Sequence, residues 1–77
     1  MNPKEEIKKL TKNIEQNQND VELYRHRGFN YCMIGDYNKA ISDYDKAIEL
    51  KSNEAVLYFE RGTAYSMKDL AKAINDY

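Results

Sequence analysis

The chain has 77 residues, of which 32% are charged, and its twelve basic and thirteen acidic side chains leave a formal net charge of −1. This length allows one small domain, and the near-neutral, slightly acidic balance argues against a nucleic-acid partner, which would select for a basic face. We expect neither a membrane span nor a signal peptide, because no apolar window is long enough, and the single Cys32 favours a reducing, cytoplasmic setting.

Apolar residues recur at three- and four-residue steps along the chain, which is the spacing of helices that each bury one face. Asn2 can cap a first helix, Asn19 or Asp20 a second, and Asp36 a third, while Gly35 is typical of a helix end. With few other breaks in the pattern, we expect five helices, at residues 3–17, 20–34, 37–51, 54–67 and 70–77.

The sequence repeats at an offset of 34 residues. Arg27-Gly28 recurs as Arg61-Gly62, and about half of the pairs aligned at this offset are identical. The second copy lacks a counterpart of Gly35, so the offset drops to 33 after that point. A fixed period of this size predicts an all-α solenoid of antiparallel helix hairpins, in which each unit buries its apolar face against its neighbours. We divide the domain into a half repeat (1–20), a full repeat (21–54) and a truncated repeat (55–77).

The pattern within each unit resembles the tetratricopeptide repeat family. The first unit reads Tyr24-x2-Arg27-Gly28-x2-Tyr31 and then Ala40-x3-Tyr44-x2-Ala47, and the second reads Tyr58-x2-Arg61-Gly62-x2-Tyr65 and then Ala73-x3-Tyr77. Ser52 and Gln18 depart from it, since the family usually has Pro at these places. The resemblance implies a scaffold for protein–protein interaction rather than an enzyme, with a protein or peptide as partner and no cofactor.

Glycine and tyrosine positions give the expected packing. Gly28 and Gly62 would lie inside helices, where Gly costs about 1 kcal/mol relative to Ala, so we expect another helix to approach closely there. Six tyrosines at helical spacing should fill the spaces between helices rather than serve a cofactor: Tyr24, Tyr31, Tyr44, Tyr58, Tyr65 and Tyr77.

Two arginines stand where the family usually has an apolar residue and need partners if they are buried. In a hairpin that turns near Gly35, Arg27 lies opposite Asp43, and the repeat-equivalent partner of Arg61 is Asp76. We therefore expect two equivalent ion pairs that join the helices of each unit.

The resemblance also implies a concave groove lined by the first helix of each unit. The corresponding groove residues are Glu22, Arg25, His26, Phe29, Cys32 and Met33, followed by Val56, Phe59, Glu60, Thr63, Ser66 and Met67. These side chains differ between the two copies while the core positions repeat. Phe29, Phe59 and the two methionines suit an apolar peptide or helix. Packing against an adjoining repeat or a second copy of the chain is an equal alternative.

A well-known ligand of proteins that resemble this one is the acidic carboxy-terminal tail of chaperones. Arg25 could occupy one basic position of the clamp, but Phe29 and Glu60 stand where the clamp needs Asn. We therefore expect no such binding. His26 and Cys32 are six residues apart with no further ligand or orienting group, so neither a metal site nor a nucleophile pair is expected.

The region around residues 66–70 allows two structures. An ordinary turn capped by Asp69 is the preferred one; the alternative is that the last two helices fuse, which would favour a domain-swapped homodimer. In either case an apolar strip lacks the cover of a following repeat. The self-association residues are Leu70, Ala73, Ile74 and Tyr77.

Overall fold

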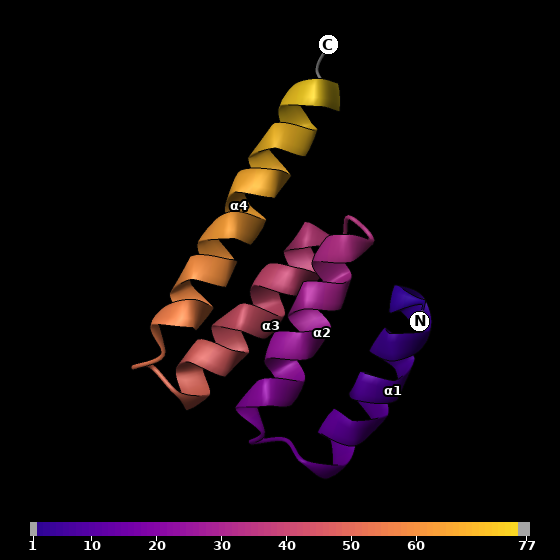
Figure 1. Ribbon diagram of the computed structural model, residues 1–77, viewed down its shortest axis with the longest axis vertical. Helices are drawn as coiled ribbons and strands as arrows, with labels where there is room; N and C mark the ends of the chain where they lie inside the picture. The colour runs from indigo at the N-terminus through magenta and orange to yellow at the C-terminus, as the bar shows by residue number, and fades with distance from the viewer. Residues whose placement is uncertain (1, 76–77) are drawn as a thin grey trace.

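The computed structural model describes residues 2–75, and within that range the chain is entirely helical apart from its turns. The helices are α1 (Pro3–Gln16), α2 (Val21–Met33), α3 (Tyr37–Leu50) and α4 (Ala55–Asn75). They lie side by side in chain order, and the far end of α4 projects beyond the other three (Figure 1). The all-α helix-hairpin fold is confirmed, with four helices in place of the expected five. Within the described residues, no helix has the length and apolar character needed to cross a membrane.

The predicted capping residues account for the starts of the first three helices. Asn2 accepts a hydrogen bond from the backbone N–H of Lys4 at 2.8 Å, and Asp20 accepts one from Glu22 at 3.1 Å. Asp36 occupies the same place before α3, with its Oδ1 3.4 Å from the backbone nitrogen of Lys39. Each side chain satisfies an N–H that the helix itself leaves unpaired, so the caps fix where the helices begin.

The turn between α2 and α3 depends on Gly35. This residue has a φ of 79°, a left-handed conformation that only glycine adopts at little cost. Its N–H donates to the carbonyl of Cys32 at 3.0 Å, and the N–H of Asp36 donates to the carbonyl of Tyr31 at 2.9 Å. The two bonds make a Schellman motif, which satisfies the last carbonyls of α2 and reverses the chain.

The turn that we expected after residue 67 is absent, so this prediction was wrong. Residues 55–75 form one uninterrupted helix, so the expected helix at 54–67 and the described part of the one at 70–77 are joined in α4. The second repeat lacks the counterpart of Gly35 and passes directly from Lys68 to Asp69. Without a residue suited to positive φ, the backbone continues its helical hydrogen bonding through Asp69, although Asp69 is a good capping residue. Asp76 and Tyr77 lie outside the described residues.

The core consists of two clusters that hold neighbouring helices together. One contains Ile14, Tyr24, Ala47 and Leu57, and the other contains Ala40, Ile41, Tyr44 and Ala64. The expected close approach is present at Gly28, where an added Cβ would lie 3.2 Å from the ring of Tyr44 and 3.3 Å from the carbonyl oxygen of Ala40. The core therefore lies mainly in the full repeat and at its two junctions.

In the truncated repeat, the expected close approach of another helix at Gly62 is absent, so that prediction was wrong. A Cβ added at Gly62 would meet nothing within 4 Å, and Tyr58 and Tyr65 are exposed rather than packed between helices. The cause is the continuous α4: the segment that should fold back over Gly62 instead carries straight on. Tyr77, the last tyrosine of the expected set, lies outside the described residues.

The ion pair predicted for the full repeat is present. The Nε and Nη2 of Arg27 donate to the two carboxylate oxygens of Asp43 at 2.8 and 2.7 Å, and Asp43 is buried. This bidentate bond raises the pKa of the Arg27 guanidinium, partly opposed by burial. For Arg61, the expected partner Asp76 lies outside the described residues. Within the described residues, Arg61 pairs with the exposed Asp45 on α3, at 2.8 Å.

Candidate functional site

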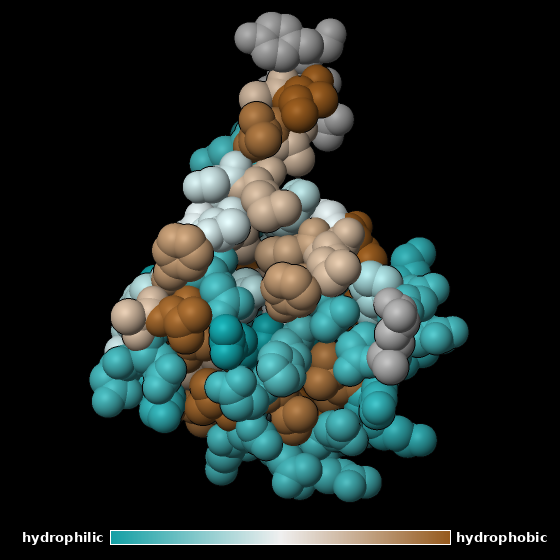
Figure 2. Space-filling view, viewed as in Figure 1, coloured by the Kyte–Doolittle hydropathy of each residue, from teal (hydrophilic) through white to brown (hydrophobic). Residues whose placement is uncertain are grey.

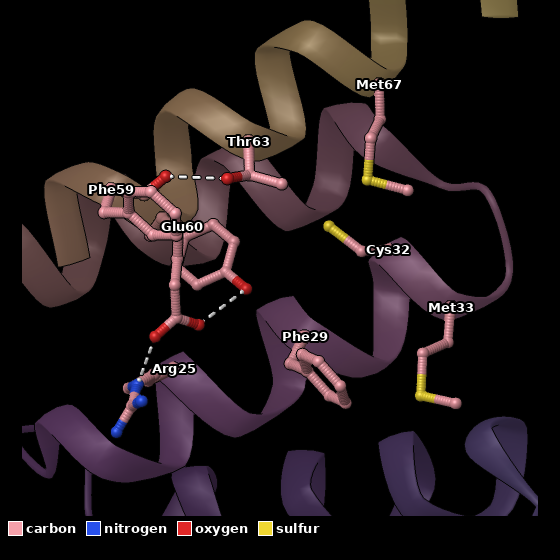
Figure 3. A pocket seen from close by; sticks show the side chains of 9 residues that line it. Arg25, Phe29, Cys32, Met33, Phe59, Glu60, Thr63 and Met67 are labelled. Carbon is pink, nitrogen blue, oxygen red and sulfur yellow. Dashed lines mark hydrogen bonds and ion pairs between the residues drawn. The ribbon is translucent and has the colours of Figure 1, made fainter. Parts of the chain in front are cut away.

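A hollow of about 440 Å³ opens between α2 and α4, and we call it the α2–α4 groove. Its lining residues are Arg25, Phe29, Cys32, Met33, Tyr44, Phe59, Glu60, Thr63 and Met67. The labelled side chains come from α2 and α4, on the two sides of the hollow (Figure 3), and Tyr44 of α3 completes the lining. All but Tyr44 belong to the groove set expected from the sequence.

Helical spacing explains why these side chains converge. On α2, Arg25, Phe29 and Cys32 recur at four- and three-residue steps, so they share one face. On α4, Phe59, Thr63 and Met67 follow the same rule. The first helices of successive repeats thus present one face each to the same hollow.

Apolar side chains dominate the groove. Phe29 and Phe59 are 54% and 74% exposed, and Met33 and Met67 are exposed as well. The Cys32 thiol and the methionine sulfurs gather at one end, away from Arg25 and Glu60 (Figure 3). Large apolar side chains left open to solvent in a concave site are the usual mark of an interaction surface.

The polar end of the groove is closed on itself. The Nε of Arg25 donates to Oε1 of Glu60 at 2.6 Å, and the hydroxyl of Tyr44 donates to Oε2 of the same carboxylate at 3.2 Å. The hydrogen bond to Glu60 raises the pKa of Arg25, and burial together with the negative charge of Glu60 raises the pKa of Tyr44. Both carboxylate oxygens of Glu60 are therefore occupied, and the guanidinium already has an anionic partner.

Cys32 lies in the apolar part of the groove. Burial raises the pKa of its thiol above the ordinary value of 9.0, and the charge of Glu60 adds to the effect. The thiol is therefore neutral at physiological pH and contributes packing rather than nucleophilic chemistry. Within residues 2–75, no group of three metal-ligating side chains comes together.

Four residues of the expected groove set lie outside the hollow. Glu22, His26 and Val56 do not line it, and Ser66 belongs to a neighbouring open hollow beside Gly62. Glu22 lies 3.4 Å from Arg25 and 3.7 Å from the imidazole of His26, which places the three at the rim.

Sequence reasoning missed Tyr44, because its repeat position predicted only core packing. Tyr44 serves both places: its ring packs in the core and its hydroxyl reaches the groove. The pairing of Arg25 with Glu60 was also missed. The available signal was a pair of opposite charges on the groove faces of successive first helices.

The comparisons with known proteins agree with this architecture. The sequence profile of the TPR repeat matches residues 30–69, just over half of the chain. The chain belongs to the tetratricopeptide repeat family. No solved structure matches it.

Curated relatives of this TPR chain are much longer proteins. It is 29% identical over 76 residues to Protein SGT1 homolog of Bos taurus, and the match covers 97% of the chain and 22% of that protein. It is 35% identical over 68 residues to Tetratricopeptide repeat protein 13 of Homo sapiens, covering 88% of the chain and 8% of that protein. It is 31% identical over 74 residues to Hsp70-Hsp90 organizing protein 3 of Arabidopsis thaliana, covering 95% and 13%. The TPR chain thus spans about a fifth of the length of these relatives or less.

Membership of this family makes the chain a protein–protein interaction module, of a kind that is typically not catalytic. A second exposed apolar surface lies on the far half of α4, where Leu70 and Ile74 are 63% and 65% exposed and Ala73 is exposed too. Figure 2 shows apolar side chains along this projecting end, whereas polar side chains predominate over the opposite end, with apolar patches between them.

Proposed function

We propose that this TPR chain binds an apolar segment of a protein partner, as a peptide or a single helix, in the α2–α4 groove. The observation that carries the proposal is the pair Phe29 and Phe59, which face the same hollow from successive repeats and remain largely exposed. Covering two phenylalanines removes a large apolar area from water, at about 25 cal/mol per Å². Met33 and Met67 flank them and can adjust their shape to a ligand.

The polar end of the groove supports a ligand other than an acidic tail. An incoming carboxylate would have to displace Glu60 from Arg25 or lie beside a second negative charge. Since the hydrogen bond between them measures 2.6 Å, that displacement would give up a strong charge-assisted contact. This applies to chaperone tails, even though one similar protein is named Hsp70-Hsp90 organizing protein 3.

A displayed library of random 15-residue peptides, selected on the immobilised chain, tests the proposal. Selected peptides should contain apolar anchors, and their affinity, measured by fluorescence anisotropy, should fall at least tenfold for the Phe29→Ala, Phe59→Ala double variant, since buried aromatic anchors dominate such interfaces. The matched control is Ile34→Ala, because Ile34 is an exposed apolar residue outside the groove. Failure to select any peptide, or equal binding by the double variant, contradicts the proposal.

Self-association is a second candidate function, favoured by a separate observation. Leu70 and Ile74 are exposed on the far half of α4, which projects beyond the other helices (Figure 1). An exposed apolar strip of this kind favours association between copies. Light-scattering mass measurement across protein concentrations tests self-association. A monomer at every concentration contradicts it and leaves the proposal of peptide binding in the α2–α4 groove unchanged.

A further inference from the structure

We propose that two copies of this chain exchange the far halves of α4, so that residues 70–75 of each pack on the other's α4 around Gly62. The receiving surface, which we call the Gly62 face, consists of Gly62 and Tyr65. The proposal rests on self-association and not on peptide binding in the α2–α4 groove, although Phe59, Thr63 and Met67 line both hollows.

The Gly62 face lacks the cover that its repeat equivalent has. At Gly28, the ring of Tyr44 and the backbone of Ala40 come so close that an added Cβ would lie 3.2–3.3 Å away. At Gly62 nothing lies within 4 Å of the same position. An open hollow of about 500 Å³ includes Gly62, with Tyr58 and Leu70 among its lining residues. Gly62 therefore allows a close helix contact that its own chain does not make.

The tyrosine one turn before each glycine shows the same contrast in exposure. Tyr24 is 7% exposed, whereas its equivalent Tyr58 is 43% exposed. Both hydroxyls donate to the equivalent carbonyl in the preceding turn, to Gln18 at 2.8 Å and to Ser52 at 2.9 Å. The local geometry of the two units is thus alike, and Tyr24 is buried because Ile14, Ala47 and Leu57 pack around it, a cover that Tyr58 lacks.

The chain itself carries a helix suited to that place. In the full repeat α3 covers α2 with Ala40 and Ile41, which are 0% and 7% exposed. Their equivalents, Ala73 and Ile74, are exposed on the far half of α4. Ala73 follows Gly62 by eleven residues on one continuous helix, which places it about 16 Å along the axis. It cannot fold back onto the Gly62 face of its own chain, but a second copy can supply it.

Reciprocal exchange gives a closed two-fold dimer with the same patch on both copies. In the full repeat, the hairpin register places Arg27 opposite Asp43. The same register, applied between α4 of one copy and α4 of the other, places Lys68 opposite Asp69 of the partner subunit. By symmetry Asp69 then lies opposite Lys68 of the partner subunit. The centre of the interface is therefore complementary in charge, and the apolar residues lie on either side of it.

The test measures molar mass by size-exclusion chromatography with light scattering, over a concentration series of the 77-residue chain. The parent should form a dimer as concentration rises. Gly62→Leu should abolish it, because Leu blocks the close contact in the dimer but meets open space in a single copy. The matched control, Ala55→Leu, adds the same side chain at an exposed position of α4 that lines neither hollow, and it should leave the dimer intact.

A second variant addresses the hinge independently. Inserting Gly after Lys68 gives the second repeat the same length as the first. It also supplies a glycine at the position equivalent to Gly35, where the backbone has a positive φ. This variant should be a monomer, with its last segment folded onto its own Gly62 face. Circular dichroism verifies that each variant remains helical.

Each outcome has a distinct meaning. A parent that stays monomeric overturns both self-association and the exchange. A dimer that persists with Gly62→Leu or with the inserted glycine overturns the exchange alone, and leaves association through another surface. Loss of the dimer in both variants but not in Ala55→Leu supports it.

Discussion

Arg25 on α2 and Glu60 on α4 form an ion pair across the polar end of the groove, with Nε and Oε1 2.6 Å apart. The pair links the first helices of two successive repeats, and Tyr44 from the helix between them donates to the same carboxylate. Glu60 thus neutralises the charge of Arg25 and also accepts a hydrogen bond from the hydroxyl of Tyr44. We therefore expect the groove to favour apolar ligands over acidic ones.

Replacing Glu60 should convert the groove to one that accepts acids. In Glu60→Gln the shape is kept but the negative charge is lost, so Arg25 becomes available to an anionic ligand. We expect an acetylated five-residue peptide with two aspartates and a free carboxyl terminus to bind about tenfold more tightly than to the parent. Fluorescence anisotropy measures the change, which should shrink with added salt.

Glu22→Gln is the matched control, because Glu22 also contacts Arg25, at 3.4 Å, but is 59% exposed. Its effect on the acidic peptide should be much smaller. Equal affinities for the parent and for Glu60→Gln would show that the ion pair does not determine ligand charge.

The ion pair between Arg27 and Asp43 should hold the full repeat together. Asp43 is buried, so Asp43→Asn leaves the Arg27 guanidinium without its counter-charge in a mostly desolvated place. Removing one partner of a buried ion pair costs about 3–5 kcal/mol. Urea unfolding followed by circular dichroism should show a loss of at least about 2 kcal/mol.

The exposed pair between Arg61 and Asp45 supplies the control. Asp45→Asn should change the free energy of unfolding by less than about 1 kcal/mol, because Asp45 is half-exposed and solvent screens the interaction. If both variants lose the same free energy of unfolding, the burial of Asp43 is not the reason that the Arg27–Asp43 pair stabilises the fold.

The sequence predicted contacts within a repeat better than contacts between repeats. Arg27 and Asp43 belong to one hairpin, so the position of the Gly35 turn fixes their register. Arg25 and Glu60 belong to different units, and their meeting depends on how the units stack, which a single repeat does not specify.

The end of the fold could not be predicted for a related reason. The missing counterpart of Gly35 was visible in the sequence, and so was the capping potential of Asp69. A capping side chain contributes about 1 kcal/mol, which does not replace a residue able to adopt positive φ. The continuous α4 in turn left Tyr58 and Tyr65 exposed, although their repeat positions are those of core residues.

Gly28 and Gly62 should respond in opposite directions to the same substitution. Gly62→Ala gains about 1 kcal/mol of helix propensity in open space. Gly28→Ala gains the same propensity but forces its Cβ against the Tyr44 ring and the Ala40 carbonyl, and overpacking costs about 1–3 kcal/mol. Thermal unfolding at a dilution where the chain is monomeric should show a higher midpoint for Gly62→Ala and a lower one for Gly28→Ala. Equal shifts for both would contradict the difference in packing.

Cys32 provides a pH-dependent probe of the groove. Burial, and then the charge of Glu60, raises the pKa of its thiol above 9.0. The folded chain therefore keeps this proton at a pH where the unfolded chain has lost it, so this contribution to stability is complete below pH 9 and declines as pH rises further. Only the thiolate reacts readily with iodoacetamide, so the rate-against-pH curve should have its midpoint above 9.0 for the folded chain, and lower in urea.

Glu60→Gln should move the folded-state midpoint down, because it removes the second cause of the shift while Cys32 stays buried. A peptide bound in the groove should slow alkylation at every pH by covering the thiol. A folded-state midpoint at or below that of the urea-unfolded chain would show that the groove does not exclude water from Cys32.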